Sequence, residues 1–204
     1  AAVDKVLKGA DFEKKLVGRT ADGVRIEPLY EAATEQAARP LRAEAGRWRV
    51  AARVDHPETI EASRLALAEL EGGADSLSLA FAGAPAARGF GLTAVSVEAL
   101  DMELDGVMLD LVRLRLVPAP VGRKQALLLA DLAEKRGHAP SSLQIDFGME
   151  PIGVLASSGT LAVPLPELGK RIAETIGALK ARGFTGPFLA PDGRIWHAAG
   201  ATEA

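Results

Sequence analysis

From Trp48 onward the chain alternates between two kinds of hydrophobic pattern. Short stretches place apolar residues at every second position, which predicts β-strands, and longer stretches repeat them at three- and four-residue spacings, which predicts α-helices. The expected strands are Trp48–Val54, Ser76–Phe81, Leu111–Val117, Leu143–Phe147 and Pro187–Ala190, the last continuing into Arg194–His197. The expected helices are Glu58–Glu71, Val95–Glu103, Arg123–Arg136 and Leu168–Arg182, with a shorter one at Val154–Ser158.

This alternation predicts an α/β fold with a parallel sheet and right-handed crossovers, either doubly wound or of the (β/α)8 barrel type. Five strand–helix units are too few to close a barrel, for which about 250 residues are typical. We therefore expect either an open sheet or one part of a barrel.

The expected strands differ from ordinary parallel strands, which are apolar on both faces because helices cover both. Here one face of the sheet is polar. Its residues are Arg47, Arg49 and Arg53 on the first strand, Ser76 and Ser78 on the second, Arg113 and Arg115 on the third, and Gln144 and Asp146 on the fourth. Since buried charges need partners, we expect an Arg–Asp and Arg–Ser network on this face, or a wet tunnel that accepts a polar ligand.

The residues before Trp48 read as an arm and a connector. Apolar spacing predicts a short helix over Ala1–Lys15, and β-branched residues on both sides of Ala21-Asp22-Gly23 predict a hairpin. Glu31–Ala45 is rich in Ala and Glu and is expected to be a mobile connector. We therefore divide the chain into an arm with connector at 1–45 and the α/β part at 46–204.

The amino-acid composition excludes several classes of function. The 204 residues contain 24 Lys+Arg and 27 Asp+Glu, a net charge of −3, and no Cys. The absence of Cys excludes thiolate zinc sites, Fe–S clusters and thiol nucleophiles. No basic face indicates nucleic acid, and no stretch approaches the roughly 20 apolar residues of a membrane span. We expect a cytoplasmic protein that binds neither nucleic acid nor a membrane.

The polar side chains of the sheet are the first candidates for chemistry. The arginines of the first and third strands are able to hold a phosphorylated ligand by bidentate contacts. Because no phosphate-binding loop accompanies them, we favour a structural ion-pair network that includes Asp146.

The three histidines are weighed in the same way. His56 precedes Pro57 and a helical stretch, so we interpret it as part of a turn, and His138 follows a helix end and is expected to be exposed. His197 is the best single candidate for acid–base work, against the common case of a structural histidine. Four carboxylates near a helix end are expected to form a solvated face and not a cation site: Asp101, Glu103, Asp105 and Asp110.

Four segments carry a family resemblance: LKGADFEKKLVGRTADGVRIEPLY (Leu7–Tyr30), ADSLSLAF, IDFGMEPIGVLASSG and GFTGPFLAPDGRIWHAAGATEA. In them the chain resembles methylmalonyl-CoA mutase, most closely its small (beta) subunit. The resemblance implies an isomerase that interconverts methylmalonyl-CoA and succinyl-CoA. It also implies acyl-coenzyme A along the axis of a (β/α)8 barrel, and adenosylcobalamin held on a separate domain by the histidine of a D-x-H-x-x-G motif.

With this resemblance we expect the fold class to be α/β, a partial (β/α)8 barrel of about five parallel strands with flanking helices, preceded by the helix and hairpin arm. The resemblance implies that the arm wraps a partner subunit. It also implies that the chain is a fragment of a longer polypeptide.

Departures from the catalytic pattern decide which subunit we expect. The catalytic subunit has a Tyr in the connector before an Arg-Pro-Trp region, whereas here Arg39-Pro40 is followed by Leu41 and the only Tyr is Tyr30. Met149–Gly159 lacks the Arg that holds the substrate carboxylate. His197 lies closer to Ala199–Thr202 than the catalytic His does, Gln144 is the one weak match to a substrate-binding residue, and no D-x-H-x-x-G occurs.

The departures favour a non-catalytic structural small subunit that pairs with a large catalytic subunit as a heterodimer. Adenosylcobalamin then belongs to the holoenzyme, and no cofactor or metal is expected on this chain. The alternative is a truncated catalytic barrel that binds acyl-CoA itself, with His197 as general acid and Arg113 and Arg115 near the ligand.

Overall fold

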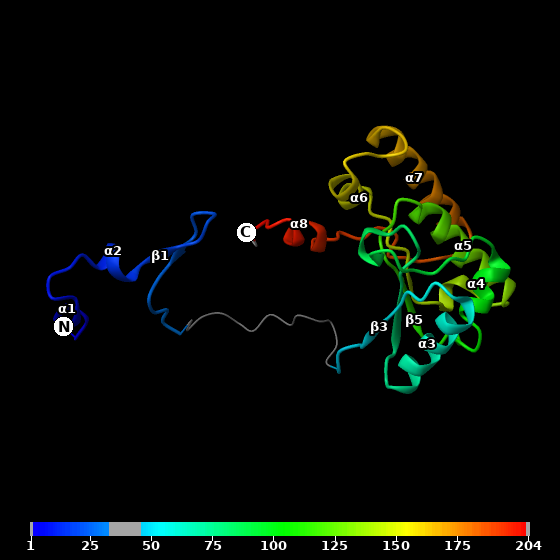
Figure 1. Cartoon of the computed structure of the whole chain (residues 1–204), viewed down its shortest axis with the longest axis horizontal. Helices are drawn as coiled ribbons and strands as arrows, with labels where there is room; N and C mark the ends of the chain where they lie inside the picture. The colour runs from blue at the N-terminus through cyan, green and yellow to red at the C-terminus, as the bar shows by residue number, and fades with distance from the viewer. Residues whose placement is uncertain (1, 33–45, 203–204) are drawn as a thin grey trace. The chain divides into compact units, whose positions relative to one another are not determined.

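Two units make up the chain, whose structure is a computed structural model that describes residues 2–32 and 46–202 (Figure 1). One unit comprises Ala1–Gly46 and His197–Ala204, and the other comprises Arg47–Trp196. Most of the predicted connector, residues 33–45, lies outside the described residues.

The arm contains two short helices where one was expected. α1 spans Ala2–Leu7 and α2 spans Phe12–Leu16. Between them Lys8 and Gly9 adopt positive φ angles of 50° and 84°, which a continuing right-handed helix does not allow. The single helix predicted over Ala1–Lys15 is therefore wrong in its length.

The hairpin of the arm follows α2. β1 (Gly18–Arg19) pairs antiparallel with β2 (Arg25–Ile26), so that Gly18 faces Ile26 across the ladder. Gly23 has a φ of 82° in the connecting turn. The turn residues Ala21-Asp22-Gly23 thus form the hairpin that their pattern predicts.

The larger unit is built on a parallel sheet of four strands. These are β3 (Ala51–Val54), β4 (Ser76–Leu79), β5 (Arg113–Leu116) and β6 (Ile145–Asp146), in the spatial order β3-β4-β5-β6. Each crossover therefore moves one strand further in the same direction. A doubly wound sheet reverses its direction at a switch point, whereas a (β/α)8 barrel does not, so the order is that of a barrel segment.

The helices of this unit are α3 (Thr59–Glu71), α4 (Val97–Glu103), α5 (Gly122–Lys135), α6 (Pro151–Ser158) and α7 (Leu165–Ala181), with short 3-10 turns η1 (Pro85–Ala87) and η2 (Pro140–Ser142). In Figure 1, α3, α4, α5 and α7 form one layer beside the sheet, and α6 lies apart from this layer. α3 packs on α4, α4 on α5, and α5 on α7. No helix in the described ranges has the length and apolar character needed to cross a membrane.

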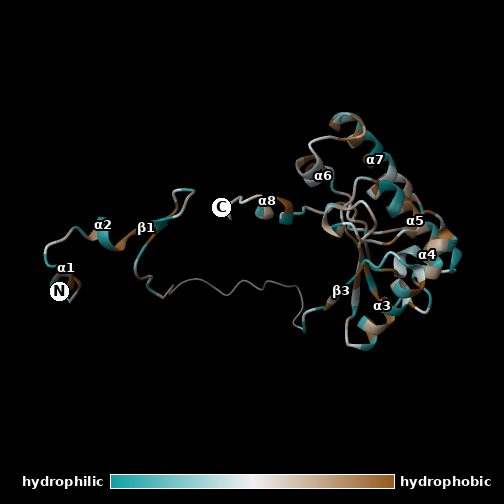
Figure 2. Ribbon diagram, in the orientation of Figure 1, coloured by the Kyte–Doolittle hydropathy of each residue, from teal (hydrophilic) through white to brown (hydrophobic). Residues whose placement is uncertain are grey.

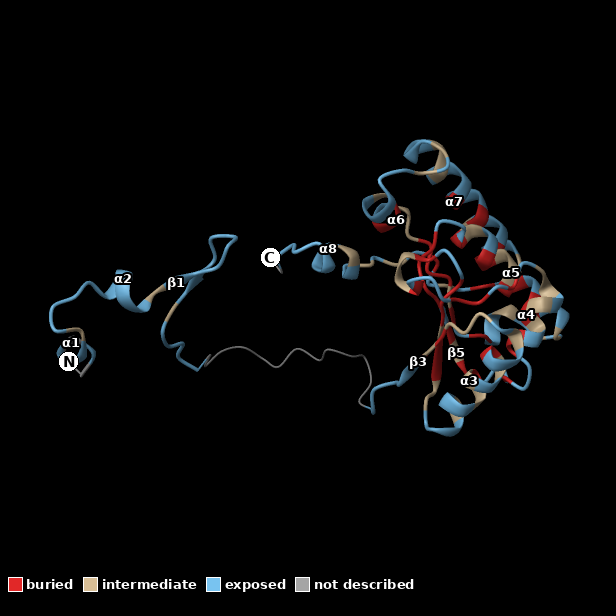
Figure 3. Cartoon of the chain, in the orientation of Figure 1, coloured by how far each residue is buried: buried red, intermediate tan, exposed pale blue. Residues whose placement is uncertain are grey.

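The core lies between this helix layer and one face of the sheet. The strand side chains that face the helices are buried: Ala52 is 9% exposed, and the others, Val54, Leu77, Leu79, Leu114, Leu116 and Ile145, are at most 2% exposed. On the helices, Ala62, Leu100 and Leu129 are fully buried. Figure 3 shows buried residues on the strands and inner helix surfaces, and Figure 2 shows the alternation of hydrophobic and hydrophilic residues that produces this arrangement.

The expected fifth strand is present only as a short parallel pairing. Leu189 bridges to Met149, and the N–H of Phe147 donates to the carbonyl of Pro187 at 2.9 Å. The predicted continuation into Arg194–His197 is wrong, because these residues begin the helix α8 (Arg194–Ala198). The carboxylate of Asp192 accepts from the N–H of Arg194 at 3.1 Å, which favours helix initiation over an extended chain.

Candidate functional site

The sheet face opposite the helices carries a polar row that crosses all four strands. In the register of the sheet Arg53 lies beside Ser78, Ser78 beside Arg115, and Arg115 beside Asp146. Each alternates with a buried apolar neighbour on its strand. The row is partly open to solvent, because the side chain of Asp146 is 18% exposed, that of Arg53 is 37% exposed, and Arg115 is exposed. In a closed barrel this face lines the axis.

Most cations of this face are engaged by the chain's own groups. Arg113 Nη2 donates to Asp146 Oδ1 at 2.6 Å, and Arg53 Nε donates to Asp55 Oδ2 at 2.6 Å. A further 2.6 Å bond joins Arg49 Nη1 to Gln144 Oε1, so the amide of Gln144 is taken by a protein side chain. Two of these contacts are the Arg–Asp pairs that the sequence predicts for this face, and the third is an Arg–Gln hydrogen bond.

Arg47 and Ser76 are two further polar residues of this sheet. Arg47 Nη2 lies 3.5 Å from Asp75 Oδ2, with which it forms an ion pair. Ser76 is buried, and its hydroxyl donates to the carbonyl of Arg113 at 3.0 Å, so it joins neighbouring strands and leaves the arginine side chains to the carboxylates.

Arg115 differs from the other sheet arginines. It is exposed in the middle of the polar row, and it has no hydrogen bond or ion pair within the described part of the chain. The charge of Arg115 contributes slightly to the lowered pKa of the Asp192 carboxyl, which is caused chiefly by a hydrogen bond from Arg194. Arg115 is therefore the cation of this face that is free to meet a ligand or another protein segment.

The histidines do not gather at the polar row. His56 Nδ1 accepts from the N–H of Glu58 at 3.1 Å, which places it in the turn before α3. His138 is half-buried, so the prediction that it is exposed is wrong. His197 is exposed in α8 and belongs to the unit that includes the arm, whereas Arg113, Arg115 and Gln144 belong to the unit that carries the sheet.

The expected solvated face of carboxylates is wrong for Glu103. Asp105 and Asp110 are exposed, but Glu103 is 0% exposed. Glu103 Oε1 accepts from the N–H groups of Thr93 and Ala94 at 2.9 and 3.0 Å, and burial raises the pKa of its carboxyl. No group of three or more His, Asp or Glu within residues 2–32 and 46–202 is arranged to hold a metal ion.

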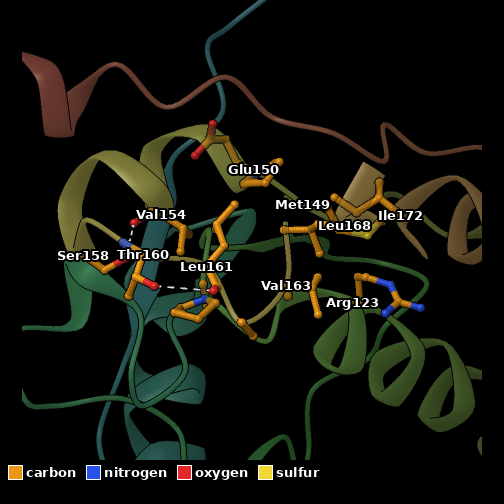
Figure 4. Close-up of a pocket in the computed structure, with 15 residues that line it drawn as sticks. Arg123, Met149, Glu150, Val154, Ser158, Thr160, Leu161, Val163, Leu168 and Ile172 are labelled. Carbon is orange, nitrogen blue, oxygen red and sulfur yellow. Dashed lines mark hydrogen bonds between the residues drawn. The ribbon is translucent and has the colours of Figure 1, made fainter. Parts of the chain in front are cut away.

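A cavity of about 380 Å³ lies where β5 and β6 end and α5, α6 and α7 meet (Figure 4). Its wall includes Ala119 and Pro120 after β5, Met149 and Glu150 after β6, and the segment 158–163. Sequence reasoning missed this cavity, because it depends on how α6 and α7 pack. The Pro-containing segments after β5 and before α7 are the only local signal of it.

The described residues do not fit a cobalamin site. Neither this cavity nor a second one between α3 and α4 is lined by a histidine, and His56 already accepts a backbone hydrogen bond through Nδ1.

Comparison with known proteins finds a relative among the subunits of a mutase. No family model matches the chain. The chain is 28% identical to the methylmalonyl-CoA mutase small subunit of Streptomyces virginiae, over an aligned length of 216 residues that covers 98% of this chain and 32% of the relative. The chain thus spans about a third of the length of that relative, and it is similar to a protein of the methylmalonyl-CoA mutase family.

Proposed function

We propose that this chain is a non-catalytic structural part of a methylmalonyl-CoA mutase small subunit. It pairs with a large catalytic subunit in a heterodimer that interconverts methylmalonyl-CoA and succinyl-CoA. The single observation that carries this proposal is the set of side-chain contacts on the polar sheet face: Arg49, Arg53 and Arg113 each bond to a side chain of this chain. Arginines committed in this way are poor anchors for the phosphates of coenzyme A.

The arm supports a role in assembly. Its helices and hairpin leave large apolar side chains exposed, including Val6 and Leu29, each 81% exposed, and Tyr30, 66% exposed. An element this small has no core of its own to cover them. A partner subunit is the surface that we propose for them, as the family resemblance implies.

The experiment is a turnover assay of the complete polypeptide with adenosylcobalamin and methylmalonyl-CoA, with and without a large mutase subunit. We expect turnover only when both are present. The isolated chain should not bind acyl-coenzyme A at micromolar concentrations in calorimetric titration. Turnover by the polypeptide alone, or micromolar acyl-CoA binding, contradicts the proposal.

A second candidate function is acyl-CoA binding by this chain itself, and Arg115 is the observation that favours it. Its exposed guanidinium has no ion pair within the described part of the chain. On this alternative, Arg115→Met weakens acyl-CoA binding by roughly tenfold, because a charge-assisted hydrogen bond is lost. His197→Ala would then also remove turnover, since His197 is the general acid in this alternative. The Lys124→Met variant, which changes an exposed cation on α5, is the matched control.

A further inference from the structure

The cavity beside α5, α6 and α7 has the size and lining of a small-molecule site. Its volume is about 380 Å³, within the range of about 300–1,000 Å³ that ligand pockets occupy. Most of its wall is aliphatic, and the side chains drawn in Figure 4 that form it are Met149, Val154, Leu161, Val163, Leu168 and Ile172. Such a wall favours an occupant with an apolar body.

One cation stands on this wall without an acidic partner. Arg123 Nε donates to Thr175 Oγ1 at 2.8 Å, which fixes the side chain against α7. Its Nη1 and Nη2 atoms have no acceptor among the residues that the structure describes. Since Thr175 is itself neutral, the charge of the guanidinium is not compensated there.

The amino end of α5, which carries Arg123, adds to the positive electrostatic potential at the cavity. α5 begins at Gly122, which also lines the cavity, and no side chain caps its first turn. That turn contains no acidic residue, while Arg123 and Lys124 place two cations there. Cations at the amino end of a helix are unfavourable, and an anion bound beside them removes the conflict.

The other polar groups of the wall are already satisfied. Both carboxylate oxygens of Glu150 accept from the N–H of Gly153, at 2.9 and 2.7 Å, so this charge caps α6. Ser158 Oγ donates to the carbonyls of Val154 and Thr160. Figure 4 shows Glu150 and Arg123 on different sides of the apolar side chains.

We propose that this cavity binds a small amphipathic anion, a carboxylate on an aliphatic chain, with the carboxylate at Arg123 and the chain against the apolar wall. The inference does not rest on the proposed structural role, because it uses no residue of the polar sheet face. The two proposals can therefore fail separately.

The test is calorimetric titration of the whole chain with octanoate, with octan-1-ol and acetate as comparison ligands. Octanoate should bind saturably at or below about millimolar concentrations. Octan-1-ol, which keeps the chain and lacks the charge, should bind at least roughly tenfold more weakly. Acetate, which keeps the charge and lacks the chain, should not bind measurably.

Variants then locate the site. Arg123→Met should weaken octanoate binding by roughly tenfold or more, whereas Arg123→Lys keeps most of the affinity. Lys170→Met, which removes an exposed charge on α7 that lies outside the cavity wall and away from the amino end of α5, should leave binding unchanged. Val163→Trp, which fills the cavity without changing charge, should abolish binding.

Several results would overturn the proposal: no saturable octanoate binding, equal affinity for octanoate and octan-1-ol, or equal losses in Arg123→Met and Lys170→Met. If Arg123→Met does not fold, the Val163→Trp variant and the comparison ligands decide. Octanoate binding that survives Val163→Trp excludes the cavity.

Discussion

Glu103 has a fully buried carboxyl group of which only one oxygen atom accepts hydrogen bonds within the described residues. Its Oε1 accepts from Thr93 and Ala94, while its Oε2 has no hydrogen-bond partner in the described part of the chain. Burial raises the pKa of the group above its ordinary value of 4.5, against the lowering effect of those hydrogen bonds. The folded state therefore holds the proton more tightly than the unfolded state.

A pH-dependent stability follows from Glu103. Its contribution to the unfolding free energy is complete below pH 4.5 and is lost as the pH rises through the folded pKa. Glu103→Gln should remove this part of the pH dependence, since the amide does not titrate. Denaturant unfolding of both proteins from about pH 4 to about pH 8 measures the difference. Parallel curves for the two proteins would show that the carboxyl does not titrate in this range.

Truncating the same residue tests its structural role. Glu103→Ala leaves the N–H groups of Thr93 and Ala94 without their acceptor, so we expect a loss of about 1–3 kcal/mol in unfolding free energy. Asp105→Ala is the matched control, because Asp105 is exposed two residues away and its side chain is expected to contribute little. Equal effects of the two truncations would argue against the role of Glu103.

For single residues, the sequence predicts which face of a strand a side chain lies on better than it predicts which side chain it pairs with. The two-residue period is enough to place Arg113 and Arg115 on one face with Asp146, and their register confirms that side-by-side placement. It does not say that Asp146 pairs with Arg113 while Arg115 stays free, because that choice depends on side-chain conformation. The burial of Glu103 was missed for a related reason: its backbone partners lie ten and nine residues away in a loop.

At the scale of elements, Arg136 joins the ends of α4 and α5. Its Nε donates to Asp101 Oδ1 at 2.6 Å, and its Nη atoms donate to the carbonyls of Asp101, Leu104 and Val107 at 2.8–3.0 Å. These carbonyls lie in and just after α4, where a cation is favourable. The pKa of Asp101 is lowered by hydrogen bonds from Lys135 and Arg136, so its contribution to stability is lost as the pH falls through that lowered pKa.

We expect Arg136→Met to lower the unfolding free energy by about 2–3 kcal/mol, because it removes the side-chain donor of the carbonyls of Asp101, Leu104 and Val107, of which that of Leu104 also accepts from the N–H of Val107. Lys135→Met should cost at most about 1 kcal/mol, since Lys135 is 43% exposed and makes one ion pair with the same Asp101. Denaturant unfolding at neutral pH compares the two. An Arg136→Met protein as stable as Lys135→Met would mean that the carbonyl bonds contribute nothing.

Among the elements, those with clear hydrophobic periodicity were predictable and those set by a local cap or by packing were not. The helix predicted at Glu58–Glu71 is α3 within one residue, since its apolar spacing is continuous. The segment Arg194–His197, predicted as a strand, is helical, because the Asp192 carboxylate accepts a hydrogen bond from the N–H of Arg194. The cavity wall after β6 depends on how α6 and α7 fold back, which no local pattern encodes.

At the scale of the whole molecule, the parallel sheet is a barrel segment with an open edge. β3 is the last strand on its side, and within residues 46–202 no strand pairs with its outer edge. Trp48 and Val50, directly before β3, are 82% and 49% exposed. An unpaired strand edge with exposed apolar side chains is a template for pairing with another chain.

We therefore expect the isolated chain to self-associate through this edge, with a sedimentation coefficient that rises with protein concentration. Trp48→Lys should reduce this association, because a charge at a strand edge opposes edge-to-edge pairing. Ile60→Lys is the matched control, since Ile60 is 67% exposed on α3 and lies away from the edge. If both variants associate as the unchanged chain does, the β3 edge is not the contact. If only Trp48→Lys becomes monomeric, β3 is the edge on which further barrel strands or a partner subunit would pair.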